Sequence, residues 1–393
     1  MISQPFPASG DSIALLRHLV SFDTTSCHTN LPLIGQVKAW LEGHGVPSHL
    51  SFNEDGNKAN LHAVLGPAGP GGIAFAGHVD TVPVTGQDWS GDPFSLREED
   101  GRLTARGATD MKGFVACMLA AVPDVLAMPL ARPVHLFLTF DEEITCDGAR
   151  VLIRDVAERG LLPSMCVVGE PTLMTPVTGH KGRLSAEMTV TGRAGHSSRP
   201  GEGVNALHAL GEAMAWTAAS ARAFAEKGRR VEGFEPPHST TQIGVASGGE
   251  ALNIIPDKAR AEIEWRTVPG DDAREFLARM EEVMRAQTES WMKAADPQSS
   301  LSFRILNELP PLDLPQDDPL AVLVRQVTGC NETGLVSYGT EAGIYQNAGV
   351  PSIVCGPGDI RQAHRPDEWI AATQLVRCDT FLREMVRRVC LRP

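Results

Sequence analysis

The sequence has no long apolar run and no cluster of basic residues. Its longest apolar stretches are well short of the roughly 20 residues that a membrane-spanning helix needs. Its 35 Lys and Arg residues are outnumbered by 48 Asp and Glu residues, which gives a formal net charge of −13. Nucleic-acid binding depends on clustered cations that neutralise phosphates. We therefore expect neither a membrane partner nor a nucleic-acid partner.

Signals for secretion and for disulfide or zinc-finger scaffolds are also absent. Residues 1–9 lack a basic segment followed by an apolar one, so we expect a cytoplasmic protein. Eight cysteines are scattered over 393 residues without a Cys-x-x-Cys pair. Disulfide scaffolds are short and cysteine-dense, and structural zinc sites use paired cysteines. Reduced thiols in the core are the expected state of these residues.

Two common catalytic motifs are missing as well. No Gly-x-Ser-x-Gly string occurs, which disfavours a serine hydrolase with a nucleophile elbow. The glycine-rich segment 66–72 precedes a strand-like run and lacks the Gly-Lys-Ser/Thr ending of a phosphate-binding loop, so we expect it to be a turn.

Four short apolar runs suggest buried strands. They span residues 72–77, 133–140, 165–169 and 351–356. Segments with helical spacing lie at 11–20, 31–45, 112–122 and 148–159. Buried strands that alternate with helices predict an α/β domain with a mostly parallel central sheet and helices on both faces.

The pattern changes between residues 183 and 307. Strand-like segments at 184–191, 240–245, 259–265 and 300–306 alternate with helical segments at 204–219 and 271–290. This order predicts an inserted α+β domain of ferredoxin-like arrangement, and the family resemblance described below implies that it serves as a lid and dimerisation domain. We expect residues 1–182 and 308–393 to form the catalytic domain, 183–307 to form the insert, and 221–237 to be a loop.

Acidic and histidine side chains follow the buried runs. They are His78 and Asp80 after the first, Asp141, Glu142 and Glu143 after the second, Glu170 after the third and His364 beyond the fourth, with Asp110 at the start of a helix. Any one of these groups alone is typical of a solvated loop. The carboxyl ends of parallel strands meet at one edge of a sheet, where ligands bind. Together they predict a site for a cation such as Zn²⁺, Co²⁺ or Mn²⁺.

Several strings at these positions carry a family resemblance. They are Gly77-His-Val-Asp-Thr-Val-Pro83, Arg106-Gly-Ala-Thr-Asp-Met-Lys-Gly113, Asp141-Glu-Glu143, Gly169-Glu-Pro171 and Gly192-Arg-Ala-Gly-His-Ser-Ser-Arg-Pro200. In this order they resemble the co-catalytic zinc amidohydrolases, which include acetylornithine deacetylase, succinyl-diaminopimelate desuccinylase, aminoacylase-1 and glutamate carboxypeptidase. Within that family, the strings at 338–342 and 356–368 resemble acetylornithine deacetylase most.

The resemblance implies two divalent metal ions, with Zn²⁺ first and Co²⁺ or Mn²⁺ as alternatives. The implied ligands are His78 and Glu170 at one ion, Glu143 and His364 at the other, and Asp110 between them. Asp80 is expected to orient the imidazole of His78, and such support raises ligand basicity. Glu142 is implied as the general base, although the residues alone leave open which member of the Glu142–Glu143 doublet is base and which is ligand.

Three residues of the insert are implied as further site residues. His196 resembles a residue that reaches the site, often from a partner subunit, and stabilises a developing oxyanion. Asn253 and Arg266 resemble lid residues that contact a substrate carboxylate. Without the resemblance, His196 reads as a surface loop histidine and Arg266 as a surface arginine at a strand end.

The expected function is metal-dependent hydrolysis of an N-acyl amino acid. N-acetylornithine, converted to ornithine and acetate in arginine biosynthesis by a homodimer, is the first substrate we expect. The same chemistry on succinyl-diaminopimelate, other N-acyl amino acids or dipeptides is the alternative. A non-catalytic binding or structural dimer is the third reading, and a missing base or ligand would have been its sign.

Overall fold

The chain forms two compact units in a computed structural model that describes residues 6–7 and 10–391. One unit contains the chain up to Gly179 together with Leu312–Leu335 and the chain from Thr340 onwards, and the other contains His180–Pro311 and Val336–Gly339. We propose that residues 183–307 delimit the inserted domain. Residues 1–5 and 8–9, part of the N-terminal segment considered above, lie outside the described residues.

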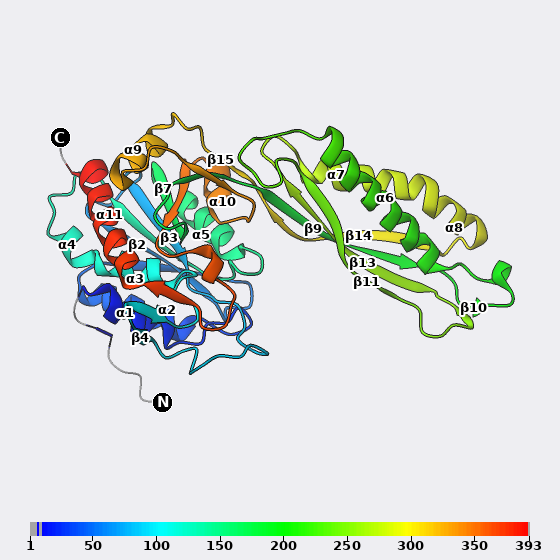
Figure 1. Ribbon diagram of the computed structural model, residues 1–393, viewed down its shortest axis with the longest axis horizontal. Helices are drawn as coiled ribbons and strands as arrows, with labels where there is room; N and C mark the ends of the chain where they lie inside the picture. Colours follow the sequence, from blue (N-terminus) through cyan, green and yellow to red (C-terminus); the bar gives the residue numbers. More distant parts are fainter. Residues whose placement is uncertain (1–5, 8–9, 392–393) are drawn as a thin grey trace. The chain divides into compact units, whose positions relative to one another are not determined.

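The first unit is built on a mixed sheet (Figure 1). Its strands are, in spatial order, β1 (Ser48–Phe52), β2 (Ala59–Leu65), β6 (Val134–Thr139), β3 (Ile73–His78), β7 (Met165–Pro171), β17 (Ser352–Gly356), β8 (Val177–His180) and β15 (Leu312–Asp313), with β16 (Gly334–Val336) beside β8. The strands β6, β3, β7 and β17 are parallel neighbours. These are the four runs that the sequence marked as buried, so the predicted α/β class with a mostly parallel centre is confirmed.

Helices and short strands complete the first unit. The helices are α1 (Ser12–Val20), α2 (Leu31–Gly43), α3 (Lys112–Ala120), α4 (Val122–Leu126), α5 (Asp147–Glu158), α9 (Pro319–Thr328), α10 (Ala342–Asn347), α11 (Ala372–Cys390) and the 3₁₀ turn η3 (Ile360–Gln362). A small separate sheet holds β4 (Arg97–Glu99), β5 (Arg102–Thr104) and β18 (Trp369–Ala371).

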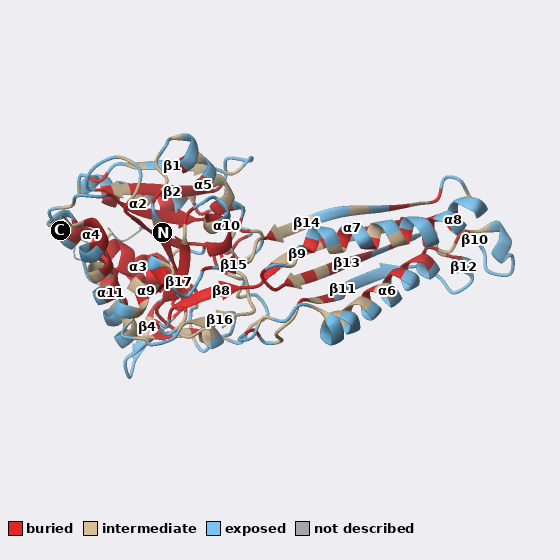
Figure 2. Ribbon diagram, turned by 90° about the horizontal axis from the view of Figure 1, so that it is seen from above, coloured by how far each residue is buried: buried red, intermediate tan, exposed pale blue. Residues whose placement is uncertain are grey.

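Strand alternation sends side chains to two buried faces. In β6, Val134, Leu136 and Leu138 join the large apolar core that α1, α3 and α11 also supply. The intervening Phe137 instead packs against Tyr345 of α10, with ring centroids 5.8 Å apart. Both faces of the central strands are therefore covered by helices, and Figure 2 shows these strands as buried. Burial on both faces explains why the strands read as continuous apolar runs.

The second unit has an antiparallel sheet in the order β11 (Thr240–Gly248), β13 (Lys258–Thr267), β9 (Gly182–Thr191), β14 (Ser300–Leu309). The remaining elements are α6 (Ala206–Lys227), α7 (Ala273–Val283), the π-helical turn η2 (Met284–Glu289), α8 (Ser290–Ala295), the 3₁₀ turn η1 (Pro200–Glu202), and the short strands β10 (Gly195–His196) and β12 (Ile254–Ile255). This is the strand order of a ferredoxin-like unit, as the sequence predicted.

One segment of the insert differs from expectation. Residues 221–237 were expected to be a loop, but α6 continues to Lys227 and only the remainder is irregular. The Ala, Arg, Glu and Lys residues at 221–227 favour a helix, and Phe224 packs against Phe276 of α7 with ring centroids 4.7 Å apart. The helix therefore continues to Lys227 and ends at Gly228, although the polar side chains of this segment suggest a loop.

The cysteines are all free thiols, and most of them are buried as expected. Cys27 is the exception, because its side chain is exposed, and Cys330 is partly exposed.

Among residues 6–7 and 10–391, no helix combines the length and the apolar character that crossing a membrane requires.

A chain of hydrogen bonds crosses the first unit beneath α5. The His135 Nε2 faces the Gly71 carbonyl oxygen at 3.1 Å, so this nitrogen is the donor and Nδ1 accepts from His62 Nε2 at 3.0 Å. His62 Nδ1 in turn accepts from Arg159 Nη2 at 2.7 Å. Burial lowers the pKa of His62 to about 3 and that of His135 to about 4. Both rings are therefore neutral in the folded protein at neutral pH.

We expect this histidine pair to make the first unit acid-sensitive. Unfolded histidines bind protons below pH 6.5, whereas the folded pair does so only near pH 4 and below, so stability falls as pH drops through this window. Each proton contributes a slope of about 1.4 kcal/mol per pH unit. The free energy of unfolding should be measured with urea between pH 7 and pH 4 and plotted against pH. In His135→Leu the slope of this plot should fall by the amount that corresponds to about one proton. An unchanged slope in His135→Leu would refute the assignment.

Candidate metal centre

The C-terminal ends of three neighbouring parallel strands bring acidic and histidine side chains together. His78 is the last residue of β3, Glu170 lies near the end of β7, and Glu142 and Glu143 follow β6. Asp110 lies in the turn before α3. These elements converge because their strands are parallel neighbours, which places their carboxyl ends at a single edge of the sheet.

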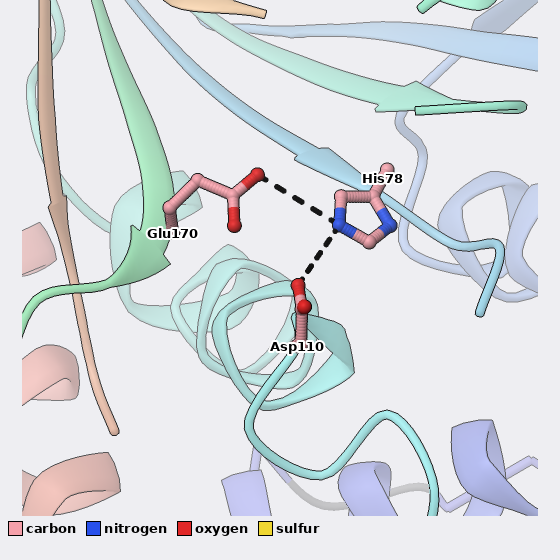
Figure 3. Close-up of side chains that lie close together, drawn as sticks. All are labelled: His78, Asp110 and Glu170. Atoms are coloured by element: carbon pink, nitrogen blue, oxygen red, sulfur yellow. Dashed lines mark hydrogen bonds and ion pairs between the residues drawn. The ribbon is translucent and has the colours of Figure 1, made fainter. Parts of the chain in front are cut away.

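The first cluster consists of His78, Asp110 and Glu170 (Figure 3). The His78 Nε2 atom lies 3.1 Å from Asp110 Oδ1 and 3.8 Å from Glu170 Oε1. All three side chains are buried. Glu170 Oε1 is itself buried and accepts no hydrogen bond from any residue that the structure describes. A buried carboxylate oxygen without a donor is costly unless a cation satisfies it.

The second cluster consists of Asp110, Glu143 and His364. The His364 Nε2 atom lies 2.9 Å from Glu143 Oε2 and 3.3 Å from Asp110 Oδ2. The two carboxylate oxygens of Asp110 thus face two different histidines, one in each cluster. Within each cluster the possible ligand atoms lie within 4.8 Å of one another. Nitrogen and carboxylate donors in this arrangement fit divalent cations, and Asp110 belongs to both clusters.

The electrostatics of the clusters agree with this fit. Burial raises the pKa of Glu142 and of Glu170 well above the usual range, and it raises the pKa of Glu143 to about 7. Hydrogen bonds to Asp110 and Glu143 raise the pKa of His364 to about 10. So many buried carboxylates repel one another and attract positive charge, and divalent cations would supply that charge.

Asp80 supports the site with both its backbone carbonyl group and its side-chain carboxylate. The imidazole Nδ1 of His78 lies 3.0 Å from the Asp80 carbonyl oxygen and 3.6 Å from its carboxylate. The carboxylate itself accepts the backbone N–H groups of Glu142 at 3.1 Å and Glu143 at 3.3 Å, and the Ser26 hydroxyl at 2.7 Å. Asp80 therefore links the segment that carries His78 to the glutamate doublet.

The residue before the doublet is also held firmly. Asp141 has a φ of 58°, in the left-handed region, which is unfavourable for a residue with a side chain. Its carboxylate forms an ion pair with Lys58, whose ammonium group also donates to the Ser26 carbonyl oxygen. This pair stabilises the sharp turn that points the doublet into the site.

Glu368 is a supporting residue to which no role was assigned from the sequence. Its buried carboxylate accepts the backbone N–H groups of Gly107, Thr109 and Asp110 at 3.1, 2.8 and 3.0 Å. It also accepts from Arg106 Nη1 at 2.8 Å, and both side chains of this pair are 1% exposed. The Glu368 carboxylate thereby fixes the turn that presents Asp110. Pairing of residues 262 positions apart leaves no local signal in a single sequence.

The remaining expected site residues belong to the second unit. His196 in β10 is exposed, and its Nδ1 accepts from the N–H of Ser198 at 3.1 Å and lies 2.8 Å from the Ser198 hydroxyl. Asn253 lies beside it, since its carbonyl oxygen accepts the Ser197 N–H at 3.0 Å. Arg266 in β13 makes a two-point ion pair with Glu264 at 3.0 and 3.1 Å.

Comparison with known proteins agrees with this site. The model of peptidase family M20/M25/M40 matches residues 74–388. The chain is 36% identical to acetylornithine deacetylase from Myxococcus xanthus and 34% identical to that from Erwinia tasmaniensis. Each alignment covers 96% of this chain and 97% of the relative. Among solved structures, an M20 family metallo-carboxypeptidase from Sulfolobus solfataricus has the same fold, with a TM-score of 0.74 at 17% identity over 96% of this chain and 98% of that one.

The fold and the paired clusters define a metal-dependent hydrolase. More particularly, the chain belongs to peptidase family M20/M25/M40 and resembles its acetylornithine deacetylases. The resemblance inferred from the sequence motifs is confirmed. The family also contains a dinuclear metal-binding peptidase from Bacillus subtilis, with a TM-score of 0.67 at 15% identity over 96% of this chain and 97% of that one.

Glu368→Gln is expected to destabilise the turn that holds Asp110. The amide would present an NH₂ group to backbone donors and remove the charge that pairs with Arg106, and breaking a buried pair costs on the order of 3–5 kcal/mol. The midpoint temperature of thermal unfolding should fall, and the metal content measured by mass spectrometry should fall with it. Glu98→Gln, which removes a half-exposed pair with Arg17, should cost less than about 1 kcal/mol. Wild-type metal content and stability in Glu368→Gln would contradict the role.

Proposed function

We propose that this hydrolase cleaves the amide bond of N-acyl amino acids, with N-acetyl-L-ornithine as the first substrate to test. The observation that carries the proposal is the position of Asp110, whose two carboxylate oxygens lie 3.1 and 3.3 Å from two histidines of two ligand clusters. The full-length similarity to acetylornithine deacetylases supports the choice of substrate.

We assign the cation-binding side chains by cluster. His78 and Glu170 would hold one ion, Glu143 and His364 the other, and Asp110 would bridge them, with zinc as the first candidate. When bound, such ions polarise a carbonyl oxygen and lower the pKa of water to about 7. Two divalent cations would be balanced by Asp110, Glu143, Glu170 and one hydroxide, so the cluster can be buried without net charge.

Glu142 is the member of the doublet proposed as general base. Its Oε2 lies 3.9 Å from His78 Nε2, and its side chain is 12% exposed. Glu143, by contrast, is held by His364 at 2.9 Å and is therefore committed to a cluster. Burial raises the pKa of the Glu142 carboxyl, which makes it a better acceptor for the proton of an attacking water. The same carboxyl would then deliver this proton to the leaving amine.

Release of ornithine from N-acetyl-L-ornithine should depend on metal and on Glu142. Chelation should abolish turnover, and Zn²⁺ or Co²⁺ should restore it. Glu142→Gln should lower kcat by about 10²–10⁴-fold with the metal content unchanged, because it removes the base and no ligand. Glu143→Gln should lose metal from one site. Absence of turnover with both ions bound would refute acetylornithine as substrate, and failure of the protein to bind metal would refute the site.

His196 is proposed to stabilise the oxyanion from a partner subunit of a homodimer. Glu142→Gln and His196→Ala should each be nearly inactive. A mixture refolded or coexpressed as heterodimers should regain up to about a quarter of the wild-type activity, because half the dimers would carry one intact site. No recovery, or a monomer in light scattering at assay concentration, would contradict a role across subunits.

Asn253 and Arg266 are proposed to bind the substrate carboxylate, and replacing either by Ala should raise KM.

A further inference from the structure

A small cavity lies directly beside the second ligand cluster. Its volume is about 270 Å³, and it is formed by three segments of the first unit, residues 25–27, 82–83 and 143–144. Glu143, the His364 partner, is part of its wall. Glu143 therefore belongs both to the second ligand cluster and to the wall of the cavity.

The wall of the cavity is fixed to the strand that carries His78. Ser26 N–H donates to the Thr81 carbonyl oxygen at 3.1 Å, and Thr81 N–H donates to the Thr24 carbonyl oxygen at 3.2 Å. The Thr24 hydroxyl donates to the Val79 carbonyl oxygen at 2.5 Å. Residues 24–26 thus run alongside residues 79–81 and form one isolated parallel bridge, between Thr25 and Thr81. These hydrogen bonds hold this wall of the cavity in place.

The polar side chains of the wall are already paired. The Thr25 hydroxyl donates to Asp23 at 2.6 Å, and the Ser26 hydroxyl donates to Asp80 at 2.7 Å. Glu143 faces His364 and belongs to the ligand cluster. What the wall still offers is apolar surface from Val82, Pro83 and Ile144 together with the Cys27 thiol. A cationic amino-acid side chain would face mostly apolar surface here, whereas an alkyl chain would lose only water.

We propose that this cavity is the acyl subsite of the hydrolase and that it takes apolar acyl chains longer than acetyl. The inference rests on the proposed N-acyl amino acid hydrolysis and specifies its substrate class. A volume of 270 Å³ is about nine times the roughly 30 Å³ that one water molecule occupies in the liquid. The methyl group of an acetyl substituent fills only a small part of it. Butyryl and hexanoyl chains would bury further methylene groups against Val82 and Ile144.

The hydrolytic test compares N-acetyl, N-propionyl, N-butyryl and N-hexanoyl derivatives of one amino acid. Each buried methylene should raise kcat/KM by up to about fourfold until the cavity is full, from a transfer free energy of about 0.8 kcal/mol. Cys27→Phe should fill the cavity, so the ratio of kcat/KM for hexanoyl over acetyl should fall at least tenfold. The matched control, Val376→Phe at an exposed position of α11, should keep the wild-type ratio.

A binding test reads the cavity without turnover. Cys27 is exposed and Cys330 only partly so, and labelling is therefore followed in a Cys330→Ser background. The Cys27 thiolate attacks the sulfenyl sulfur of methyl methanethiosulfonate, forms a mixed disulfide and releases methanesulfinate, and dithiothreitol reverses the reaction. Hexanoate, as the product carboxylate, should slow this labelling of the zinc-loaded protein at concentrations where acetate does not.

The two tests separate the proposals. Protection by hexanoate with a rising acyl series supports the subsite. Protection with no hydrolysis of any acyl amino acid would overturn the proposed function and leave the apolar cavity established as a chain-binding site. Labelling that hexanoate does not slow would overturn the subsite whatever the activity. A Cys27→Phe effect that follows the amino-acid side chain instead of the acyl chain would also overturn it.

Discussion

Repulsion among buried carboxylates is the constraint around which the first unit is organised. Asp110, Glu142, Glu143 and Glu170 share a site with two histidines, and burial raises the pKa of three of these acids. Such a group is stable only when cations or protons neutralise it, and its geometry must hold while they bind. The central strands meet that demand by carrying the side chains on backbone that is covered by helices on both faces.

Turns rather than strands set the directions of the acids. Asp110 and the glutamate doublet both lie in loops, and each loop is organised by a buried carboxylate that accepts backbone N–H groups. Glu368 does this for the Asp110 turn, and Asp80 does it for Glu142 and Glu143. Several charge-assisted hydrogen bonds on one carboxylate are strong and directional. The positions of Asp110 and Glu143 thus depend on two acids that belong to neither ligand cluster.

Much of this could be predicted from the sequence, and for identifiable reasons. The strands β3, β6, β7 and β17 are buried on both faces, so they appear as apolar runs, and the residues that follow them mark the edge of the sheet. The alternating pattern of residues 184–191 likewise reveals β9, half-buried on one side. These features are local, and local patterns survive in a single chain.

What could not be predicted depends on contacts between distant segments. The Arg106–Glu368 pair and the exposed position of Cys27 both have causes outside their own neighbourhood. The same is true of the cavity beside Glu143, whose walls come from three separated segments. Residues 25–27 carry no charge pattern that would mark them as part of a site.

The segment formed by residues 24–26 would tie the proposed acyl selectivity to catalysis. Its hydrogen bonds with residues 79–81 make the wall of the cavity and the segment following His78 one piece of backbone. Displacing this wall to admit a bulkier substrate would move the metal-binding edge as well. Evolution or design can therefore alter this surface most safely by exchanging side chains such as Cys27 or Ile144 for larger or smaller ones. The main chain, which positions both the cavity wall and the segment after His78, would then stay unchanged.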